Sequence, residues 1–247
     1  MQKFYSTKAK ILSNVKITDD IFKIKLDEPS IAKTAKPGQF VNIRIPGKIL
    51  RRPLSIFSAY KNNIVIVFKI QGEGTSILSR QKPSEYLDIL GPLGNGFPKP
   101  ISNPLFIAGG IGMAPLNFLS SSISSNGTFI YAVKKEADFV PLKNIVSRRN
   151  KLIKISEEKD CKLATDILPL YLKEAGTVYI AGPREMIKSA AAICLEHKKT
   201  GFFTWEERMG CGTGFCQGCV IKTIEGYKRT CKDGPVFSID EVDYYAF

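Results

Sequence analysis

Four cysteines near the C-terminus are the residues of this chain best suited to chemistry. They follow the spacing C-x4-C-x2-C-x11-C and are Cys211, Cys216, Cys219 and Cys231. A run of C-x4-C-x2-C with a distant fourth cysteine is a plant-type spacing for a 2Fe-2S cluster, which four thiolates hold. Gly212, Gly214 and Gly218 stand between them, and glycine can adopt the positive φ that a loop around inorganic sulfide requires. The spacing predicts an iron-sulfur cluster and single-electron transfer.

Two other uses of these cysteines fit less well. Structural zinc favours two C-x2-C-like pairs, and only Cys216 and Cys219 have that spacing. A disulfide framework is typical of small secreted chains, whereas this chain has 247 residues and no apparent secretion signal. Cys161 and Cys194 lie in apolar contexts and are expected to be packed thiols.

Length and composition narrow the class of protein. With 247 residues, of which 44% are hydrophobic, the chain suits two compact units and a small module. Its first residues lack the apolar core of a signal peptide, and no apolar run approaches the roughly 18 residues of a membrane span. We expect a cytoplasmic protein that does not enter a membrane.

The formal charge of +13 raises the possibility of nucleic-acid binding. The basic residues are spread along the chain among acids, however, and no nucleic-acid-binding motif appears, so no nucleic-acid partner is expected. A zinc-stabilised binding protein that uses this charge stays as a distant alternative. His197 is the single histidine, which argues against a Ser-His-Asp or Cys-His hydrolase.

The first part of the chain has the pattern of an antiparallel β-barrel. Between residues 5 and 97, short β-rich runs with period-2 alternation are separated by turn signals, and one short helix is expected near residues 76–80. The expected strands include residues 9–15, 21–26, 39–45 and 63–70. Glycine and proline are frequent in residues 90–101, which predicts the end of a barrel domain, residues 1–98.

The next part changes to a rhythm of strand, turn and helix. Apolar strands are expected at residues 104–108, 128–133, 152–155 and 177–181, with helical segments between them. This alternation predicts a parallel sheet with helices on both faces, an α/β nucleotide domain over residues 99–200. The cysteines then belong to a small C-terminal module, residues 201–247.

Two sets of turns could bind phosphate groups. In the barrel, Arg52 stands close to Ser55, and glycines follow at Gly72 and Gly74, where the backbone can approach a ligand. In the α/β part, the first turn contains Gly110 and Gly112, and a later turn contains Gly182 and Pro183. Such turns at the carboxyl ends of parallel strands can line one crevice. Taken singly, each of these segments also fits an ordinary structural turn or a charge pair on an edge strand.

Six strings, in this order, resemble the electron-transfer subunits of NAD-linked (class 1B) dihydroorotate dehydrogenases, within the ferredoxin reductase-like superfamily. The cysteine segment is the most specific of them, and the resemblance runs nearly from end to end. The strings are Arg52-Pro-Leu-Ser, Gly72-Glu-Gly-Thr, Gly91-Pro-Leu-Gly-Asn-Gly-Phe, Gly109-Gly-Ile-Gly-Met-Ala-Pro, Glu206-Glu-Arg-Met-Gly-Cys and Cys231-Lys-Asp-Gly-Pro-Val-Phe.

The resemblance implies a barrel that binds FAD, an α/β domain that receives NAD and a 2Fe-2S module. The FAD residues that it implies are Arg52, Pro53, Leu54, Ser55, Lys69, Ile70, Gln71, Gly74 and Thr75. No catalytic residue is assigned to this chain, because dihydroorotate would be oxidised on an FMN-containing partner subunit in a heterotetramer of two plus two. Electrons would pass from that FMN through the cluster to FAD and leave as hydride on NAD, in pyrimidine (UMP) biosynthesis.

One residue departs from the wider superfamily, whose members commonly carry a cysteine before the Gly-Pro turn. This chain has Ala181 there, so a thiol role is absent. The superfamily also contains general NAD(P)H-dependent iron-sulfur flavoprotein reductases that serve other redox partners. A general NAD(P)H-dependent reductase of this kind is the alternative function for this chain.

Overall fold

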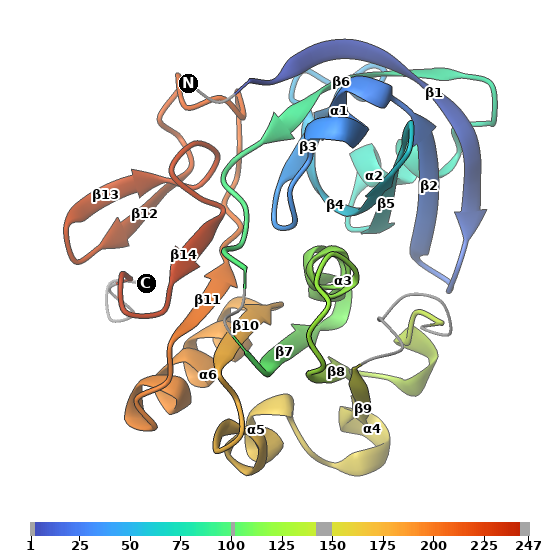
Figure 1. Cartoon of the computed structure of the whole chain (residues 1–247). Coiled ribbons are helices and arrows are strands. Elements are labelled where there is room, and N and C mark those ends of the chain that lie inside the picture. The colour runs from blue at the N-terminus through green and yellow to red at the C-terminus, as the bar shows by residue number, and fades with distance from the viewer. Residues whose placement is uncertain (1–2, 100–101, 142–149, 243–247) are drawn as a thin grey trace.

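A closed antiparallel barrel forms the first half of the structure, a computed structural model that describes residues 3–99, 102–141 and 150–242. Neighbouring strands follow the order β1-β2-β5-β4-β3-β6, which confirms the predicted barrel (Figure 1). The strands are β1 (Tyr5–Lys16), β2 (Ile21–Asp27), β3 (Phe40–Ile43), β4 (Arg52–Tyr60), β5 (Asn63–Lys69) and β6 (Tyr86–Leu93).

Alternating side chains fill the barrel. Ile24 and Leu26 on β2 and Ile64 and Ile66 on β5 are completely buried, and these two strands pair in antiparallel register. Each such side chain contributes about 1.5–3 kcal/mol relative to an exposed one. The period-2 pattern of the sequence therefore reflects one face directed into the barrel.

The barrel contains two helices, α1 (Pro29–Thr34) and α2 (Glu73–Ser79). The expectation of a single helix was wrong, since only α2 lies near the predicted residues 76–80. Glu28 caps α1 by accepting a hydrogen bond from the Ser30 N–H at 3.1 Å, Pro29 begins the helix, and Ile31 is its one buried residue. A six-residue helix with a single buried side chain has no helical periodicity to detect.

The second half is a six-stranded sheet in the order β14-β11-β10-β7-β8-β9. All neighbours pair in parallel except β14, which runs antiparallel to β11. The strands are β7 (Pro104–Gly109), β8 (Thr128–Val133), β9 (Lys151–Ser156), β10 (Thr177–Ala181), β11 (Gly201–Thr204) and β14 (Val236–Ser238). The predicted parallel sheet is confirmed.

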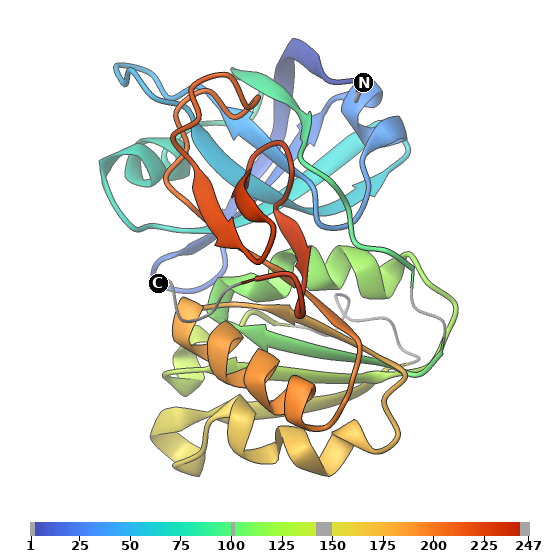
Figure 2. The same ribbon diagram turned by 90° about the vertical axis from the view of Figure 1, so that its left-hand side faces the viewer.

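Helices cover both faces of this sheet, as predicted (Figures 1 and 2). On one face α3 lies between the sheet and the barrel, and Asn117 on α3 donates a hydrogen bond to the Phe57 carbonyl of β4 at 3.1 Å. On the other face α5 and α6 pack together over a separate apolar core. The helical elements are η1 (Gly110–Gly112), α3 (Met113–Ser121), η2 (Glu136–Asp138), α4 (Glu157–Asp160), α5 (Ala164–Leu172) and α6 (Arg184–Glu196).

The cysteines lie in a segment, residues 205–235, that both leaves and rejoins this sheet. It follows β11, contains the hairpin of β12 (Val220–Thr223) and β13 (Gly226–Arg229), and returns into β14. We call it the cysteine segment. The predicted boundary between residues 200 and 201 thus falls within the sheet rather than at its end. In the part of the chain that the structure describes, no helix has the length and apolarity to cross a membrane.

Candidate functional site

The cysteine segment brings its four thiols together as two pairs. The Cys211 sulfur accepts a hydrogen bond from the Cys216 N–H at 3.4 Å, and the Cys219 sulfur accepts one from the Cys231 N–H at 3.4 Å. Among the described residues, no three His, Cys, Asp or Glu side chains converge as a site for a single metal ion. Two pairs of thiolates are the donor set of a two-iron cluster, so these residues fit a 2Fe-2S unit.

Burial differs along the segment. Cys219 and Cys231 are buried, Cys211 is half-buried and Cys216 is exposed. Burial raises the pKa of Cys231 to about 12, with its neighbour Cys219 adding to the shift. For Cys211 burial also raises the pKa, but hydrogen bonds from Cys216 and Thr213 outweigh it and bring the pKa to about 6. One pair therefore lies at the surface and the other lies inside.

Two of the three glycines have the predicted positive φ. Gly212 has φ +76° and lies against the barrel, where an added Cβ would stand 2.5 Å from the Asn42 side-chain nitrogen. Gly214 has φ +89°, and its Cβ would approach the Lys232 side chain to 2.7 Å. The expectation for Gly218 was wrong, because the positive φ there belongs to Gln217, at 53°.

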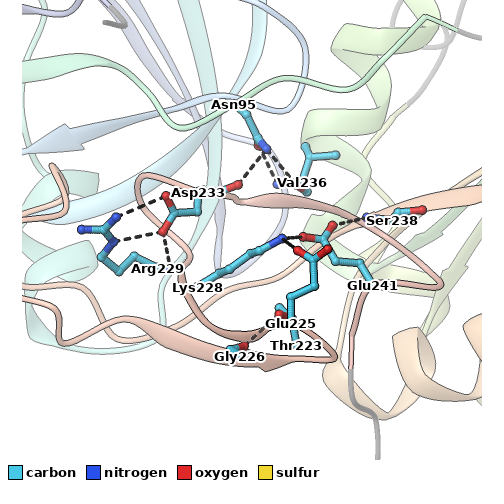
Figure 3. Close-up of polar contacts among 10 residues, drawn as sticks. All are labelled: Asn95, Thr223, Glu225, Gly226, Lys228, Arg229, Asp233, Val236, Ser238 and Glu241. Carbon is cyan, nitrogen blue, oxygen red and sulfur yellow. Dashed lines mark hydrogen bonds and ion pairs between the residues drawn. The ribbon is translucent and has the colours of Figure 1, made fainter.

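Two basic residues of the hairpin, Lys228 and Arg229, form ion pairs with acidic side chains (Figure 3). Lys228 forms ion pairs with Glu225, at 3.2 Å, and with Glu241. The Arg229 Nε lies 3.0 Å from an Asp233 carboxylate oxygen. The Arg229 guanidinium also donates to the Gly214 carbonyl at 3.3 Å. These two cations stabilise the fold of the cysteine segment.

Asn95, which follows the last barrel strand, holds the return of the segment to the sheet (Figure 3). Its side-chain amide donates to the Asp233 carbonyl at 3.0 Å and to the Val236 carbonyl at 2.9 Å. Its oxygen accepts from the Val236 N–H at 3.0 Å. Sequence analysis missed this residue, because its partners lie far along the chain.

A pocket joins the barrel to the cysteine segment. We call it the Trp205 pocket, and it is lined by Phe40, Pro53, Ser55, Thr204, Trp205, Glu206, Glu207, Met209 and Pro235. Pro53 and Ser55 were predicted site residues, and both face this pocket from β4. The other lining residues were missed. The position of residues 205–207 gave a signal, because they directly follow the parallel strand β11 at the edge of the sheet where both Gly-rich turns lie.

Two side chains are shared between the Trp205 pocket and the cysteines. Phe40 and Met209 line the pocket, and both also belong to an apolar cluster that contains Leu93, Cys219 and Cys231. The buried pair of thiols is therefore separated from the pocket by apolar side chains and not by solvent.

The remaining predicted barrel residues lie in different surroundings. Arg52 lies on the first turn of α2, since a Cβ on Gly74 would be 2.6 Å from the Arg52 Nε. The Thr75 hydroxyl accepts from the Gln71 N–H at 3.0 Å and shapes the same turn. Arg51, next in sequence to Arg52, instead pairs with Asp88 at 2.8 Å. Arg52, Gly74, Thr75 and Gln71 thus come together.

Three other predicted barrel residues, Leu54, Lys69 and Ile70, lie neither in the Trp205 pocket nor at the first turn of α2. Leu54 packs against the core inside the barrel, opposite to its neighbours Pro53 and Ser55. The Lys69 ammonium pairs with the Asp20 carboxylate at 3.0 Å, and the Ile70 N–H donates to the Asp20 carbonyl at 2.7 Å. These contacts connect Lys69 and Ile70 to the turn between β1 and β2.

The two Gly-rich turns of the sheet meet directly. A Cβ on Gly112 would lie 2.3 Å from the Ala181 carbonyl oxygen and 2.5 Å from the Gly182 nitrogen. A Cβ on Gly109 would lie 2.7 Å from Pro183. Gly110 has φ +51°, and no atom lies within 4 Å of the position its Cβ would take. The structure thus brings Gly110, Gly112, Gly182 and Pro183 together at the carboxyl ends of β7 and β10, the edge of a parallel sheet at which ligands bind in such folds.

Glu206 is a titratable group of the Trp205 pocket that sequence analysis did not select as a site residue. Desolvation by the surrounding protein raises the pKa of its carboxyl group, and the nearby Arg184 guanidinium partly opposes this shift.

The comparisons with known proteins agree with this geometry. The family model for the iron-sulfur cluster binding domain of dihydroorotate dehydrogenase B matches residues 206–243. The electron transfer subunit of dihydroorotate dehydrogenase B (NAD+) from Clostridium perfringens is 33% identical, covering 96% of this chain and 98% of its own length. Its counterpart from Caldanaerobacter subterraneus is 32% identical over the same shares.

Solved structures share the fold. One, described as the NADH-dependent reduced ferredoxin-NADP oxidoreductase of flavin-based electron bifurcation, superposes with a TM-score of 0.86 at 27% identity. It covers 96% of this chain and 90% of its own. The ferredoxin reductase of carbazole 1,9a-dioxygenase gives a TM-score of 0.68 at 18% identity, over 79% and 67% of the two chains, and shows likeness of fold alone. With the paired thiols, the barrel and the parallel sheet in place, the chain belongs to the family of electron transfer subunits of dihydroorotate dehydrogenase B (NAD+).

Proposed function

We propose that this chain carries electrons from the FMN of a dihydroorotate dehydrogenase catalytic subunit to NAD, by way of a 2Fe-2S cluster and FAD, in pyrimidine (UMP) biosynthesis. A flavin is required between the other two carriers, because nicotinamide exchanges a hydride and an iron-sulfur cluster accepts one electron. The chain would supply binding sites and surroundings for these groups, and oxidation of dihydroorotate would occur on the partner.

The observation that carries the proposal is the pair of side chains shared by the Trp205 pocket and the cysteines. Phe40 and Met209 line the pocket and belong to one apolar cluster with the buried thiols Cys219 and Cys231, so a flavin ring held in the pocket would be separated from these thiols by such side chains. Water is excluded from that layer, which is one of the means by which a protein sets the potential of an iron-sulfur cluster.

The residues would divide the work by position. Cys211, Cys216, Cys219 and Cys231 would hold the cluster. Pro53 and Ser55 would contact the flavin ring, while Arg52 would meet the pyrophosphate beside the first turn of α2, as an arginine can with two parallel hydrogen bonds. Leu54, Lys69, Ile70, Gln71, Gly74 and Thr75 would contribute backbone or turn contacts, and Gly110, Gly112, Gly182 and Pro183 would receive NAD.

The partner would bind where the cysteine segment reaches the surface. Cys216 is exposed, and Phe215 beside it is 86% exposed. An FMN-containing subunit docked there would bring its flavin close to the cluster, and two copies of each chain would form a heterotetramer. The three-part division into residues 1–98 for FAD, 99–200 for NAD and 201–247 for the cluster is part of the same proposal.

Purification of this chain under anaerobic conditions, with and without an FMN-containing dihydroorotate dehydrogenase catalytic subunit, tests the proposal. Dihydroorotate-dependent reduction of NAD should require both subunits, and iron, sulfide and FAD should be found in this one. Reduction of many acceptors by NADH, with no gain from the partner, would instead support a general NAD(P)H-dependent reductase. A colourless preparation loaded with zinc would contradict both.

A further inference from the structure

Arg184 connects two parts of the candidate site that are distant in the sequence. It is the first residue of α6 and directly follows Pro183 in the second Gly-rich turn. Its side chain reaches away from that turn to residues 205–207, which line the Trp205 pocket. The turn and the pocket are thus joined by one side chain.

Arg184 makes direct contacts with Glu206, Glu207 and Trp205. Its Nη2 donates to the Glu206 carbonyl oxygen at 3.0 Å and to the Glu207 Oε1 at 2.7 Å. The same Oε1 accepts from the Trp205 Nε1 at 3.0 Å. The guanidinium also lies over the Trp205 ring, 5.1 Å from its centroid. Only a planar group can stack on an indole and donate in its own plane, so lysine would not replace this arginine.

Arg184 is more exposed than the side chains that it contacts. Trp205 is completely buried, and the Glu207 side chain is 19% exposed. The Arg184 side chain is 51% exposed, so it stays accessible to solvent while its partners are held in place. A displacement of the turn by a bound dinucleotide would therefore pass through Arg184 to the wall of the pocket.

We propose that Arg184 is a positioning residue that couples the binding of NAD at the Gly182–Pro183 turn to the placement of Trp205, Glu206 and Glu207 against the flavin. This rests on the proposed function, since it requires NAD at the turn and FAD in the pocket. Arg184 acts through the three residues that it contacts, all of which line the pocket.

Trp205 is the single tryptophan of the chain, so its fluorescence reports on this point alone. The experiment titrates NAD into the FAD-loaded, full-length protein and follows tryptophan emission, with calorimetry on the same samples for NAD affinity and absorbance for bound FAD. In the wild type, emission should change with the midpoint of NAD binding. In Arg184→Ala and Glu207→Leu, NAD and FAD should still bind, but the change in emission should be lost.

Two further variants are matched controls. Glu207→Gln keeps an oxygen that can accept from Trp205 and Arg184, and it should retain the response. Lys16→Ala removes an exposed ion pair of the barrel, Lys16 with Asp19 at 3.2 Å, and should respond as the wild type does.

Three results would overturn the inference: an unchanged response in Arg184→Ala, no response of the wild type at saturating NAD, or loss of FAD binding together with the response in Arg184→Ala. The last would make Arg184 a purely structural contact. If the wild type binds neither FAD nor NAD, the proposed function fails first, and the absorbance and calorimetry show this before any variant is compared.

Discussion

Replacement of Gly112 by alanine tests whether the two Gly-rich turns form the NAD site. The new Cβ would lie 2.3 Å from the Ala181 carbonyl oxygen and 2.5 Å from the Gly182 nitrogen. Both are backbone atoms, so no change of rotamer can relieve the overlap, and the turns must move apart.

The size of the effect follows from the cost of overpacking. Inserting a methyl group into a closely packed site costs about 1–3 kcal/mol. If the turns separate and NAD must restore their packing to bind, that cost appears as a loss of NAD affinity of about five- to 150-fold. FAD and the cluster, whose proposed residues lie on other elements, should be retained.

Calorimetric titration of NAD into FAD-loaded Gly112→Ala measures this directly. Gly47→Ala is the control: no atom lies within 4 Å of its Cβ position, and its φ of +70°, unlike the −59° of Gly112, makes it the more strained position for alanine. That variant should show the strain of the substitution without any change in NAD affinity. An affinity of Gly112→Ala within twofold of the wild type, in a folded protein, would refute the assignment of these turns.

Three further predictions concern the cysteine segment. Asn95→Ala removes three hydrogen bonds to residues 233 and 236 and should cost about 2 kcal/mol, which lowers the Tm by about 4–8 °C in calorimetry; a Tm equal to that of Lys16→Ala would contradict this. Cys231→Ser should lose iron and sulfide by chemical analysis while it keeps FAD and NADH-diaphorase activity, and loss of FAD as well would show that the two sites are not separate. Burial raises the pKa of Asp233, but hydrogen bonds from Arg229 outweigh it and lower the pKa overall. Above the unfolded pKa of about 3.9, Asp233→Asn should therefore be less stable than the wild type. This difference in stability should vanish as the pH falls through the lowered pKa of the folded protein, which Tm measurements on both proteins from pH 7 to pH 3 can follow.

The architecture could be predicted because its signals are local. Alternation in residues 21–26 and 63–70 indicated β2 and β5, and the apolar runs near Gly110 and Gly182 indicated the parallel strands. In contrast, β11 and β14 are four and three residues long, and their membership of the sheet depends on pairing between positions such as Thr204 and Val236. Nothing in a short run of residues specifies such a distant partner.

The candidate site, like the fold, could be predicted only where its signals are local in the sequence. The cysteine spacing identified four candidate metal ligands, and the string around Arg52 led to the pocket. The sequence could not show that Arg51 is bound to Asp88 while Arg52 lies over Gly74, because the two arginines differ only in the tertiary contacts they make. The same holds for Trp205, whose neighbours come from the barrel and from α6.

The anchoring of the cysteine segment at both ends has a consequence for how such a protein can be altered. Thr204 and Val236 are direct partners across adjacent antiparallel strands, so the whole segment is an insertion whose two ends already lie side by side. Closing that gap with a short hairpin turn would leave the sheet complete, because the loop's length has little effect on the cost of joining its ends. The segment could thus be excised or grafted as a cassette, provided that apolar residues that it contributes or covers, such as Trp205 and Leu93, are replaced at the same time.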